Sequence, residues 1–386
     1  MDFQLTEEHL MIQQAARDFA ENVLKEGVIE RDEKQYFPKE LIQQMGELGF
    51  LGMMVDPRYG GGGLDVVSYT LAMIEIAKWD ASAAVIMSVN NSLVCWGLEH
   101  YGSEEQKQKY LTRLAKGEII GSFCLSEPEA GSDATQQRTT AIDKGDHYLV
   151  NGTKNWITNA GHAEVYLVMA QTDKEKAHRG INCLIVERGM EGFEVGPKEN
   201  KLGIRGSDTH SLNFNDVKVP KENRIGVEGF GFKFAMGTLN GGRIGIGAQA
   251  LGIAEGSLNL AKEYAKIRMI YDKNLKKSVP ISTLQVIQFK LADMATEVEA
   301  SRLLLLRAAV DKENNAESAA QSAAMAKLYA SKTAMFCASE AIQIHGGNGY
   351  VKEYHVERFL RDAKITEIYE GTSEIQRVVI SRNVLK

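Results

Sequence analysis

Cysteine and proline are scarce in this chain. Its 386 residues include only 4 cysteines and 6 prolines. The cysteines, at Cys95, Cys124, Cys183 and Cys337, lie far apart, with no C-x-x-C pair and no histidine cluster beside them. A disulfide framework or a zinc site would need closer spacing. We therefore expect buried free thiols and no bound metal.

Long apolar runs and targeting signals are missing as well. The strongly apolar run Leu303–Leu306 ends at Arg307, far short of the ~20 residues that cross a bilayer. The stretch from Met1 to Gln4 includes an acid and shows neither a basic region with an apolar core nor an Arg-rich segment. The pattern predicts no membrane span and a cytoplasmic location of the bacterial kind. A processed organellar protein would have the same pattern.

Positive charge is in deficit. The chain has 45 Lys and Arg against 51 Asp and Glu, a formal net charge of −6, and the two signs are interspersed. Such a chain has no overall attraction for phosphate backbones, so we expect no nucleic-acid partner. With 44% hydrophobic and 25% charged residues, the composition is typical of a globular protein.

Apolar periodicity divides the chain into three regions, which we interpret as domains at 1–118, 119–228 and 229–386. The first region is helical, with Thr6 as a candidate N-cap and apolar residues every four positions at Met11, Ala15, Phe19 and Val23. The third returns to long helices. Its clearest 3,4 spacing, typical of a helical bundle, is formed by Leu284, Ile287, Leu291, Met294, Val298 and Leu305.

The second region has the pattern of a small β domain. Short apolar runs at Tyr148–Val150, Val165–Ala170 and Ile181–Val186 alternate with Gly, Asp and Asn turn residues. The order along the chain is therefore α, then β, then α. This order predicts a fold of the α+β class that is mainly α.

One motif would indicate a nucleotide site if it were considered without its sequence context. Gly245–Ala250 satisfies G-x-G-x-x-A, the dinucleotide fingerprint. That fingerprint needs a preceding strand and a βαβ unit, whereas this stretch lies in a helical pattern. We expect close helix packing at this position instead of phosphate binding.

Two polar segments carry the strongest chemical signal. Glu370 precedes Gly371 and Thr372, a pattern typical of one helix ending and the next beginning, where a carboxylate can project into a cavity. The turn-rich stretch Leu125–Asp133 offers hydroxyls and backbone amides suited to a polar ring edge or a phosphate. Taken alone, each segment is also typical of a solvated loop.

Together these segments resemble signatures of the acyl-CoA dehydrogenase family. Trp156–Thr158 and Gln343–Tyr350 match further signatures, and Glu370 lies within another, Arg361–Glu374. Ser88–Leu93 and Gly242–Gly245 are most similar to short-chain (butyryl-CoA) members. The resemblance implies the acyl-CoA dehydrogenase fold, with an N-terminal helical domain, a central β domain and a C-terminal four-helix bundle. It also implies bound FAD and a homotetramer arranged as a dimer of dimers.

The resemblance also implies a reaction. It is the flavin-dependent α,β-dehydrogenation of a short-chain acyl-CoA to a trans-2-enoyl-CoA, with electrons passed to an electron-transferring flavoprotein. Glu370 would be the base that removes the α-proton, and its backbone N–H would donate a hydrogen bond to the thioester oxygen. Some relatives carry the base at the position of Gly242, where a glycine cannot abstract a proton.

The family signatures assign ligand contacts to individual residues of this chain. Those implied to bind FAD are Phe123, Leu125, Ser126, Ser132, Trp156, Thr158, Thr372 and Glu374. Those implied to reach the FAD of a neighbouring subunit are Arg268, Gln285, Gln343, Gly346 and Gly347. Those implied to contact the acyl-CoA are Ser132, Asn240, Arg243 and Gly371. Asn90, Asn91 and Leu93 lie on a helix that is expected to close the far end of the acyl pocket.

Two departures from the family pattern affect these assignments. Between Arg268 and Gln285 the segment 269–280 is longer and more basic than in relatives, and Tyr271 is the only candidate to replace a ring that packs on the adenine. Asn240 stands where close relatives carry Asp. Two other functions stay open: an enoyl-CoA reductase that works in reverse within a flavoprotein complex, and a non-catalytic acyl-CoA-binding paralogue.

Overall fold

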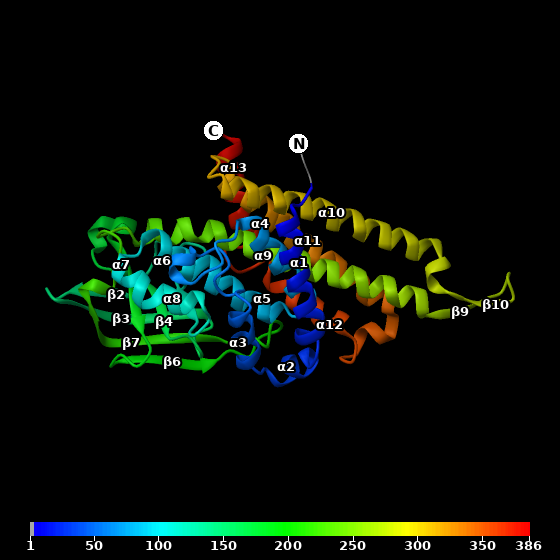
Figure 1. Cartoon of the computed structure of the whole chain (residues 1–386), viewed down its shortest axis with the longest axis horizontal. Helices are drawn as coiled ribbons and strands as arrows, with labels where there is room; N and C mark the ends of the chain where they lie inside the picture. The colour runs from blue at the N-terminus through cyan, green and yellow to red at the C-terminus, as the bar shows by residue number, and fades with distance from the viewer. Residues whose placement is uncertain (1–3) are drawn as a thin grey trace.

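The computed structural model describes residues 4–386 as three structural regions in chain order (Figure 1). Residues 1–3, on which part of the expectation about targeting rests, lie outside the described residues. A helical region comes first, a β-sheet lies at one end of the molecule, and long helices run away from it. The predicted α, β, α order is confirmed.

The N-terminal region consists of short helices around a buried core. Its α-helices are α1 (Glu7–Phe19), α2 (Val28–Lys34), α3 (Lys39–Glu47), α4 (Val66–Ala77), α5 (Ala81–Ser88), α6 (Trp96–Tyr101), α7 (Glu104–Gln106) and α8 (Thr112–Ala115). Three π-helical segments and one 3₁₀ turn connect them: η1 (Ala20–Leu24), η3 (Val89–Cys95), η4 (Lys107–Leu111) and η2 (Pro57–Tyr59). π-Helical turns are rare and often lie at functional sites, and η3 lies beside the site described below.

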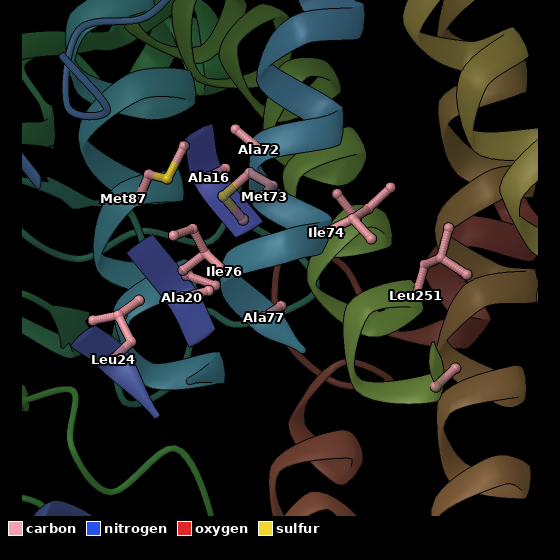
Figure 2. Packing of buried hydrophobic residues seen from close by; sticks show 14 of the residues in the cluster. Ala16, Ala20, Leu24, Ala72, Met73, Ile74, Ile76, Ala77, Met87 and Leu251 are labelled. Atoms are coloured by element: carbon pink, nitrogen blue, oxygen red, sulfur yellow. The ribbon is translucent and has the colours of Figure 1, made fainter. Parts of the chain in front are cut away.

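The first helix begins as predicted but buries only part of the predicted face: Phe19 is buried, whereas Met11 and Ala15 are exposed. Thr6 caps α1 by accepting a hydrogen bond from the His9 N–H. Met11 is 72% exposed, and the residues of α1 and η1 that face the core include Ala16, Ala20 and Leu24, which pack against α4 (Figure 2). A spacing of exactly four residues drifts by about 40° per step around a 3.6-residue helix. Met11 and Ala15 therefore point away from the core.

The helical run Ala81–Tyr101 is long and apolar enough to cross a bilayer by length and composition. It is instead a core helix, because 94% of its most apolar window is buried inside the fold. Its polar residues at 88 and 90–92 are buried with it.

The middle region is one mainly antiparallel sheet. Its strands are β1 (Gly121–Cys124), β2 (Thr140–Asp143), β3 (His147–Thr158), β4 (Val165–Gln171), β5 (Ile181–Glu187), β6 (Phe193–Lys198), β7 (Thr209–Pro220) and β8 (Arg224–Ile225). The spatial order is β6-β7-β3-β2-β4-β5-β8, with β1 paired in parallel to β4. Short 3₁₀ turns, η5 (Lys174–Gly180) and η6 (Lys221–Asn223), join strands. The strand predictions at 148–150, 165–170 and 181–186 are confirmed.

The C-terminal region is a bundle built on three long helices. These are α9 (Gly231–Ile267), α10 (Gln285–Glu313) and α11 (Ala319–His345), with α12 (His355–Ile365) and α13 (Ser373–Val384) packed on α11. A hairpin of β9 (Met269–Asp272) and β10 (Lys277–Pro280), the turn η7 (Ile281–Thr283) and the turn η8 (Gly346–Tyr350) lie at the bundle end far from the sheet. The unusual segment 269–280 is thus a projecting hairpin (Figure 1).

Glycines of α9 allow the central helices to approach closely. A Cβ on Gly247 would lie 2.9 Å from Leu305 Cδ1 of α10, and one on Gly252 would lie 2.6 Å from Ala77 Cβ of α4. The G-x-G-x-x-A stretch lies wholly within buried α9, so the packing interpretation is confirmed. The four cysteines are buried free thiols, also as predicted.

The sheet region docks on α12 through a loop with no room for a side chain. A Cβ on Gly203 would lie 2.7 Å from the Asp362 backbone nitrogen. Beside it, the Ile204 N–H donates to Asp362 Oδ1 (2.5 Å), and Arg358 donates to Asp362 Oδ2 (3.0 Å). These contacts hold the middle region against the helix that leads to Glu370.

We predict that Gly203→Ala destabilises the protein by about 1–3 kcal/mol, because the new methyl group collides with backbone that cannot move aside. Urea unfolding measures the change. Gly131→Ala is the matched control, since a Cβ there meets nothing within 4 Å. Equal stability of the two variants would show that the loop can shift on α12 without cost.

Candidate functional site

Glu370 lies at the break between α12 and α13. Its φ is 51° and that of Gly371 is 92°, both in the left-handed region, which non-glycine residues seldom adopt. Thr372 then caps α13 by accepting a hydrogen bond from the Ile375 N–H (3.3 Å). The predicted end and restart of a helix at this point is confirmed.

Side chains from two helices hold this strained turn. Gln376 Nε2 donates to the carbonyls of Glu370 (3.2 Å) and Gly371 (2.8 Å). Lys327 Nζ of α11 donates to the Gly371 carbonyl (2.8 Å). Within residues 4–386, the structure gives no acceptor to the backbone N–H of Glu370. The turn therefore fixes the carbonyls and leaves the Glu370 N–H available to a ligand.

The Glu370 carboxyl group points into the protein. The residue as a whole is partly exposed, but Oε2 is buried and has no hydrogen-bond partner among the described residues. A Cβ on Gly242 of α9 would overlap this oxygen and would lie 2.8 Å from Leu93 Cδ2. Glycine at position 242 thus leaves the space in which the carboxyl group lies.

Burial changes the acidity of this group. Desolvation raises the pKa of Glu370 to about 7, although the positive charges of Lys327 and Arg243 act in the opposite direction. Desolvation disfavours the charged form of any acid. A carboxylate with a pKa near neutrality can both take up and release a proton at neutral pH, as a general base must.

Hydroxyl groups lie one helical turn further along α9. Tyr69 OH and Ser88 Oγ are 3.2 Å apart, and both would crowd a Cβ on Gly245. Ser92 Oγ lies 3.5 Å from Ser88 Oγ. With Leu93, these side chains bound the space beside Glu370 on the side of α5 and η3.

Asn90 and Asn91 do not line this space. Asn90 Nδ2 donates to the carbonyls of Leu51 and Leu114, and Asn91 Nδ2 donates to the carbonyl of Phe50. Both amides hold neighbouring loops, because the π-helical turn η3 rotates them away from α9. The two side-chain amides are thus engaged elsewhere, whereas Leu93 of the same helical run lies next to the Glu370 carboxyl group. That this helix closes the far end of an acyl pocket stays a prediction.

The residues predicted to face a flavin ring meet at one edge of the sheet. Trp156 lies in a bulge of β3, with φ 60° and 63% of its surface exposed. The Asn155 N–H donates to the Ser126 carbonyl (2.9 Å), which joins the 125–133 loop to this bulge. Thr158 is tied to β1, because the Ser122 hydroxyl donates to its carbonyl (2.8 Å). Leu125, Ser126 and Trp156 are thus neighbours, and Phe123 lies just before them on β1.

A buried ion pair supports this loop from behind. Lys154 Nζ, fully buried, lies 2.7 Å from Glu127 Oε1 and also donates to the Leu125 carbonyl (3.1 Å). Glu127 accepts bonds from the backbone N–H groups of Arg138 and Thr139. The pair fixes both ends of the loop and leaves Ser132 at an exposed position between them. Sequence reasoning missed this pair, because its members stand 27 residues apart.

The predicted acyl-CoA contacts lie around the Glu370 turn. Arg243 is 7% exposed and donates to Asn240 Oδ1 (2.7 Å) one turn earlier on α9. Gly371 forms the turn itself, and Thr372 and Glu374 follow at the start of α13. Ser132 belongs to the sheet loop instead, so it is separate from the other three.

The remaining cofactor residues lie at the opposite end of α9. Arg268 follows the last turn of α9, and its carbonyl accepts from the Ile281 N–H in the turn that leads to α10. Asn348 of η8 donates to Tyr264 OH (2.9 Å), which places η8 at the same end. The predicted cofactor residues at this end are all exposed: Arg268, Gln285, Gln343, Gly346 and Gly347. From Gly242 to Arg268 the helix spans roughly 40 Å, at about 1.5 Å per residue.

Lys327 and Gln376 were not anticipated from the sequence. Both are completely buried. The available signal for Lys327 was a lysine within the alanine-rich run of α11, spaced four residues from Ser331 on one helix face. Such a lysine is typical of an exposed side chain, so the pattern alone favours the wrong environment.

Three family models match the chain in order. Their descriptions are acyl-CoA dehydrogenase N-terminal domain, over residues 6–118, middle domain, over 122–217, and C-terminal domain, over 229–385. Together they cover both the Glu370 turn and the sheet edge that carries Trp156.

Individual relatives match over the full length. The chain is 47% identical to a short-chain-specific acyl-CoA dehydrogenase of Clostridium acetobutylicum, with 100% of both chains covered. It is 47% identical to the butyryl-CoA dehydrogenase structure from Megasphaera elsdenii, with a TM-score of 0.96 and 100% of both chains covered. A chain in a structure described as an electron-transferring flavoprotein of Acidaminococcus fermentans is 48% identical, with a TM-score of 0.97 and 100% of both chains covered.

The acidity of Glu370 predicts how stability depends on pH. Its pKa is about 7 in the fold, against an ordinary value of 4.5, so the folded state binds this proton more tightly than the unfolded state. The stability that protonation provides is complete below about pH 4.5 and is lost as the pH rises through 7. Glu370→Gln, which cannot ionise, should therefore be more stable than the parent protein at pH 8, by at most ~3 kcal/mol.

The difference should shrink as the pH falls to 5, and thermal unfolding at both pH values measures it. Glu191→Gln, at an exposed position, is the control and should show no such trend. A stability difference between Glu370→Gln and the parent protein that is the same at pH 5 and pH 8, or that favours the variant more at pH 5, would contradict a raised pKa.

Proposed function

The chain belongs to the acyl-CoA dehydrogenase family, and on that premise we propose that it oxidises a short-chain acyl-CoA, such as butyryl-CoA, to the trans-2-enoyl-CoA. We propose further that the electrons pass to an electron-transferring flavoprotein. The observation that carries the proposal is the buried Glu370 Oε2, unpartnered beside Gly242 and with the carboxyl pKa near neutrality.

The residues at the sheet edge fit an FAD. The exposed Trp156 indole, held in a bulge, offers a flat surface for a ring system, and Ser126 and Thr158 offer hydroxyls beside it. Phe123, Leu125, Ser126, Ser132, Trp156 and Thr158 would hold the flavin part, with Thr372 and Glu374 at the start of α13. When bound, FAD supplies the acceptor for the hydride that leaves the β-carbon of the substrate.

Glu370 performs the proton transfer in this proposal. Its carboxylate takes the α-proton next to the thioester and becomes a neutral acid. The backbone N–H of Glu370, which has no acceptor within residues 4–386, donates to the thioester oxygen as negative charge develops there. One such donor typically contributes ~3–4 kcal/mol to a transition state of this kind.

The short acyl chain is supported by the relatives and by the space beside Glu370. The matched proteins from C. acetobutylicum and M. elsdenii carry short-chain and butyryl-CoA in their names. In this chain the hydroxyls of Tyr69 and Ser88 lie only one helical turn from Gly242, at Gly245. Arg243 and Asn240 would contact the CoA part. The match to a chain of the A. fermentans structure supports the electron acceptor.

We also propose that the FAD site is shared between copies of the chain in a homotetramer. Along α9, Arg268 lies roughly 40 Å from Gly242, which is beside the Glu370 turn. The separation of Arg268, Gln285, Gln343, Gly346 and Gly347 from that turn supports a role for them at the cofactor of another copy. Apolar residues exposed on α10, among them Val286, Phe289 and Val310, support an interface there. A cytoplasmic location stays a prediction from the sequence.

Glu370→Gln tests the base directly. The variant should still bind FAD and butyryl-CoA, while bleaching of the flavin absorbance on anaerobic addition of butyryl-CoA slows at least a thousandfold, because the amide cannot accept the proton. Stopped-flow absorbance measures the rate. Glu367→Gln, three residues earlier and ion-paired with Lys364 (2.6 Å), is the control that should bleach normally. Normal bleaching of Glu370→Gln would assign the base to another residue.

A mixing experiment tests the shared cofactor site. Trp156→Ala and Gln343→Ala should each lower FAD occupancy when expressed alone. Co-expressed in equal amounts, they should regain up to roughly a quarter of the FAD sites, since some sites then combine an intact sheet edge from one copy with an intact helix end from another. Bound FAD per chain is measured by absorbance. No recovery on mixing would place both residues at a site within one chain.

A further inference from the structure

Lys327 is a lysine whose burial the fold itself does not explain. The side chain is 0% exposed, and lysine is almost never fully buried unless it is paired. Within residues 4–386, its ammonium group forms no ion pair with a carboxylate. The hydrogen bond that Nζ makes is to the Gly371 carbonyl (2.8 Å).

The surroundings of Lys327 leave its charge little water. Gly247 of α9 packs against the backbone of Lys327, and a Cβ there would lie 3.7 Å from its Cα. Burial lowers the pKa of Lys327 to about 8, while the charge of Glu370 acts to raise it. The other charged groups that act on it are Arg243 of α9, Glu367 at the end of α12 and Glu374 at the start of α13. Glu370 has the largest influence among them.

We propose that Lys327 is a positioning residue for the Glu370 base: its ammonium group holds the Gly371 carbonyl and thereby the left-handed turn, and its charge keeps the neighbouring carboxylate ionised at neutral pH. The role as base rests on the proposed function. The contact between Lys327 and the turn is independent of it.

Charge distinguishes Lys327 from the other groups that hold the backbone between the end of α12 and the start of α13. Gln376 also donates to the Gly371 carbonyl, and Ser331, one turn along α11, donates to the Thr366 carbonyl (2.8 Å). These neutral donors would be sufficient for a structural role. A buried ammonium is costly and gives the turn only one more hydrogen bond. What it adds beside Glu370 is a positive charge in a poorly screened environment, where a nearby opposite charge lowers an acid's pKa by about 1–3 units.

Lys327→Gln separates the two roles, because the amide keeps an N–H donor for the Gly371 carbonyl and removes the charge. The measurement is infrared difference spectroscopy of the Glu370 carboxylic acid C=O band between pH 5 and 10, with the band assigned by subtracting the spectrum of Glu370→Gln. The parent protein should titrate near pH 7. In Lys327→Gln the midpoint should rise by about 1–2 units.

Ser331→Ala is the matched control, since it removes a neutral donor from the same helix to the end of α12 and leaves the charge in place. Its midpoint should stay within about 0.3 units of the parent value, an expectation that follows from the unchanged charge. If Lys327→Gln does not fold, Lys327→Met, which fills the same space without a polar group, replaces it with the same expected shift. A midpoint that is unchanged or lower in the charge-free variant overturns the proposal.

A second readout links the charge to the reaction. At pH 7 the flavin of Lys327→Gln should be bleached by butyryl-CoA about tenfold more slowly than that of the parent protein, and most of the rate should return at pH 9, because one unit of pKa is a tenfold change in ionised base. Loss of rate at every pH would indicate a distorted turn and contradict the role of the charge. If the parent protein itself is not bleached, the proposed function fails, whereas the infrared titration still decides whether Lys327 controls Glu370.

Discussion

The Glu370 carboxyl group and a side chain at position 242 cannot occupy the same space. Because Gly242 has no side chain, the carboxyl group can lie against α9. The backbone at Glu370 that directs it there is in a left-handed conformation. A non-glycine residue in that conformation costs of order 1–3 kcal/mol. The hydrogen bonds of Gln376 and Lys327 to the turn offset this cost.

The electrostatics of the site follow from the same placement. Burial alone would keep the Glu370 carboxyl group neutral, which is the wrong state for a base. Positive charge from two other helices, Arg243 on α9 and Lys327 on α11, opposes that effect. The result is a carboxyl group poised near neutrality, where one proton is both accepted and released with little free-energy change.

The length of α9 organises the molecule at a larger scale. One end of this helix contacts the sheet, where the Gly229 N–H donates to Asn182 Oδ1 (2.8 Å). Its other end carries Arg268 and the hairpin of β9 and β10. A rigid helix keeps these ends apart, so in the proposed function each copy would present half of one cofactor site at either end. Assembly of copies is therefore part of the proposed function and not an addition to it.

The sequence by itself determined the features that depend on near neighbours in the chain. The α, β, α order, the cap at Thr6, the helix break before Thr372 and the buried thiols all follow from periodicity and capping within a few residues. Family resemblance added Glu370 as the base. Where exact helix rotation mattered, at Met11, the local pattern failed, because a small angular drift moves a side chain to another face.

Only the tertiary structure decided what lies around Glu370. Lys327 touches the turn from 44 residues away in the chain, and Gly242 meets the carboxyl group from the middle of a different helix. Contacts of this kind depend on how whole helices pack, and neither a lysine nor a glycine in the sequence indicates which residue it will contact. A lysine among alanines predicts a solvated side chain. In the fold Lys327 is buried instead, and its positive charge acts on the Glu370 carboxyl group.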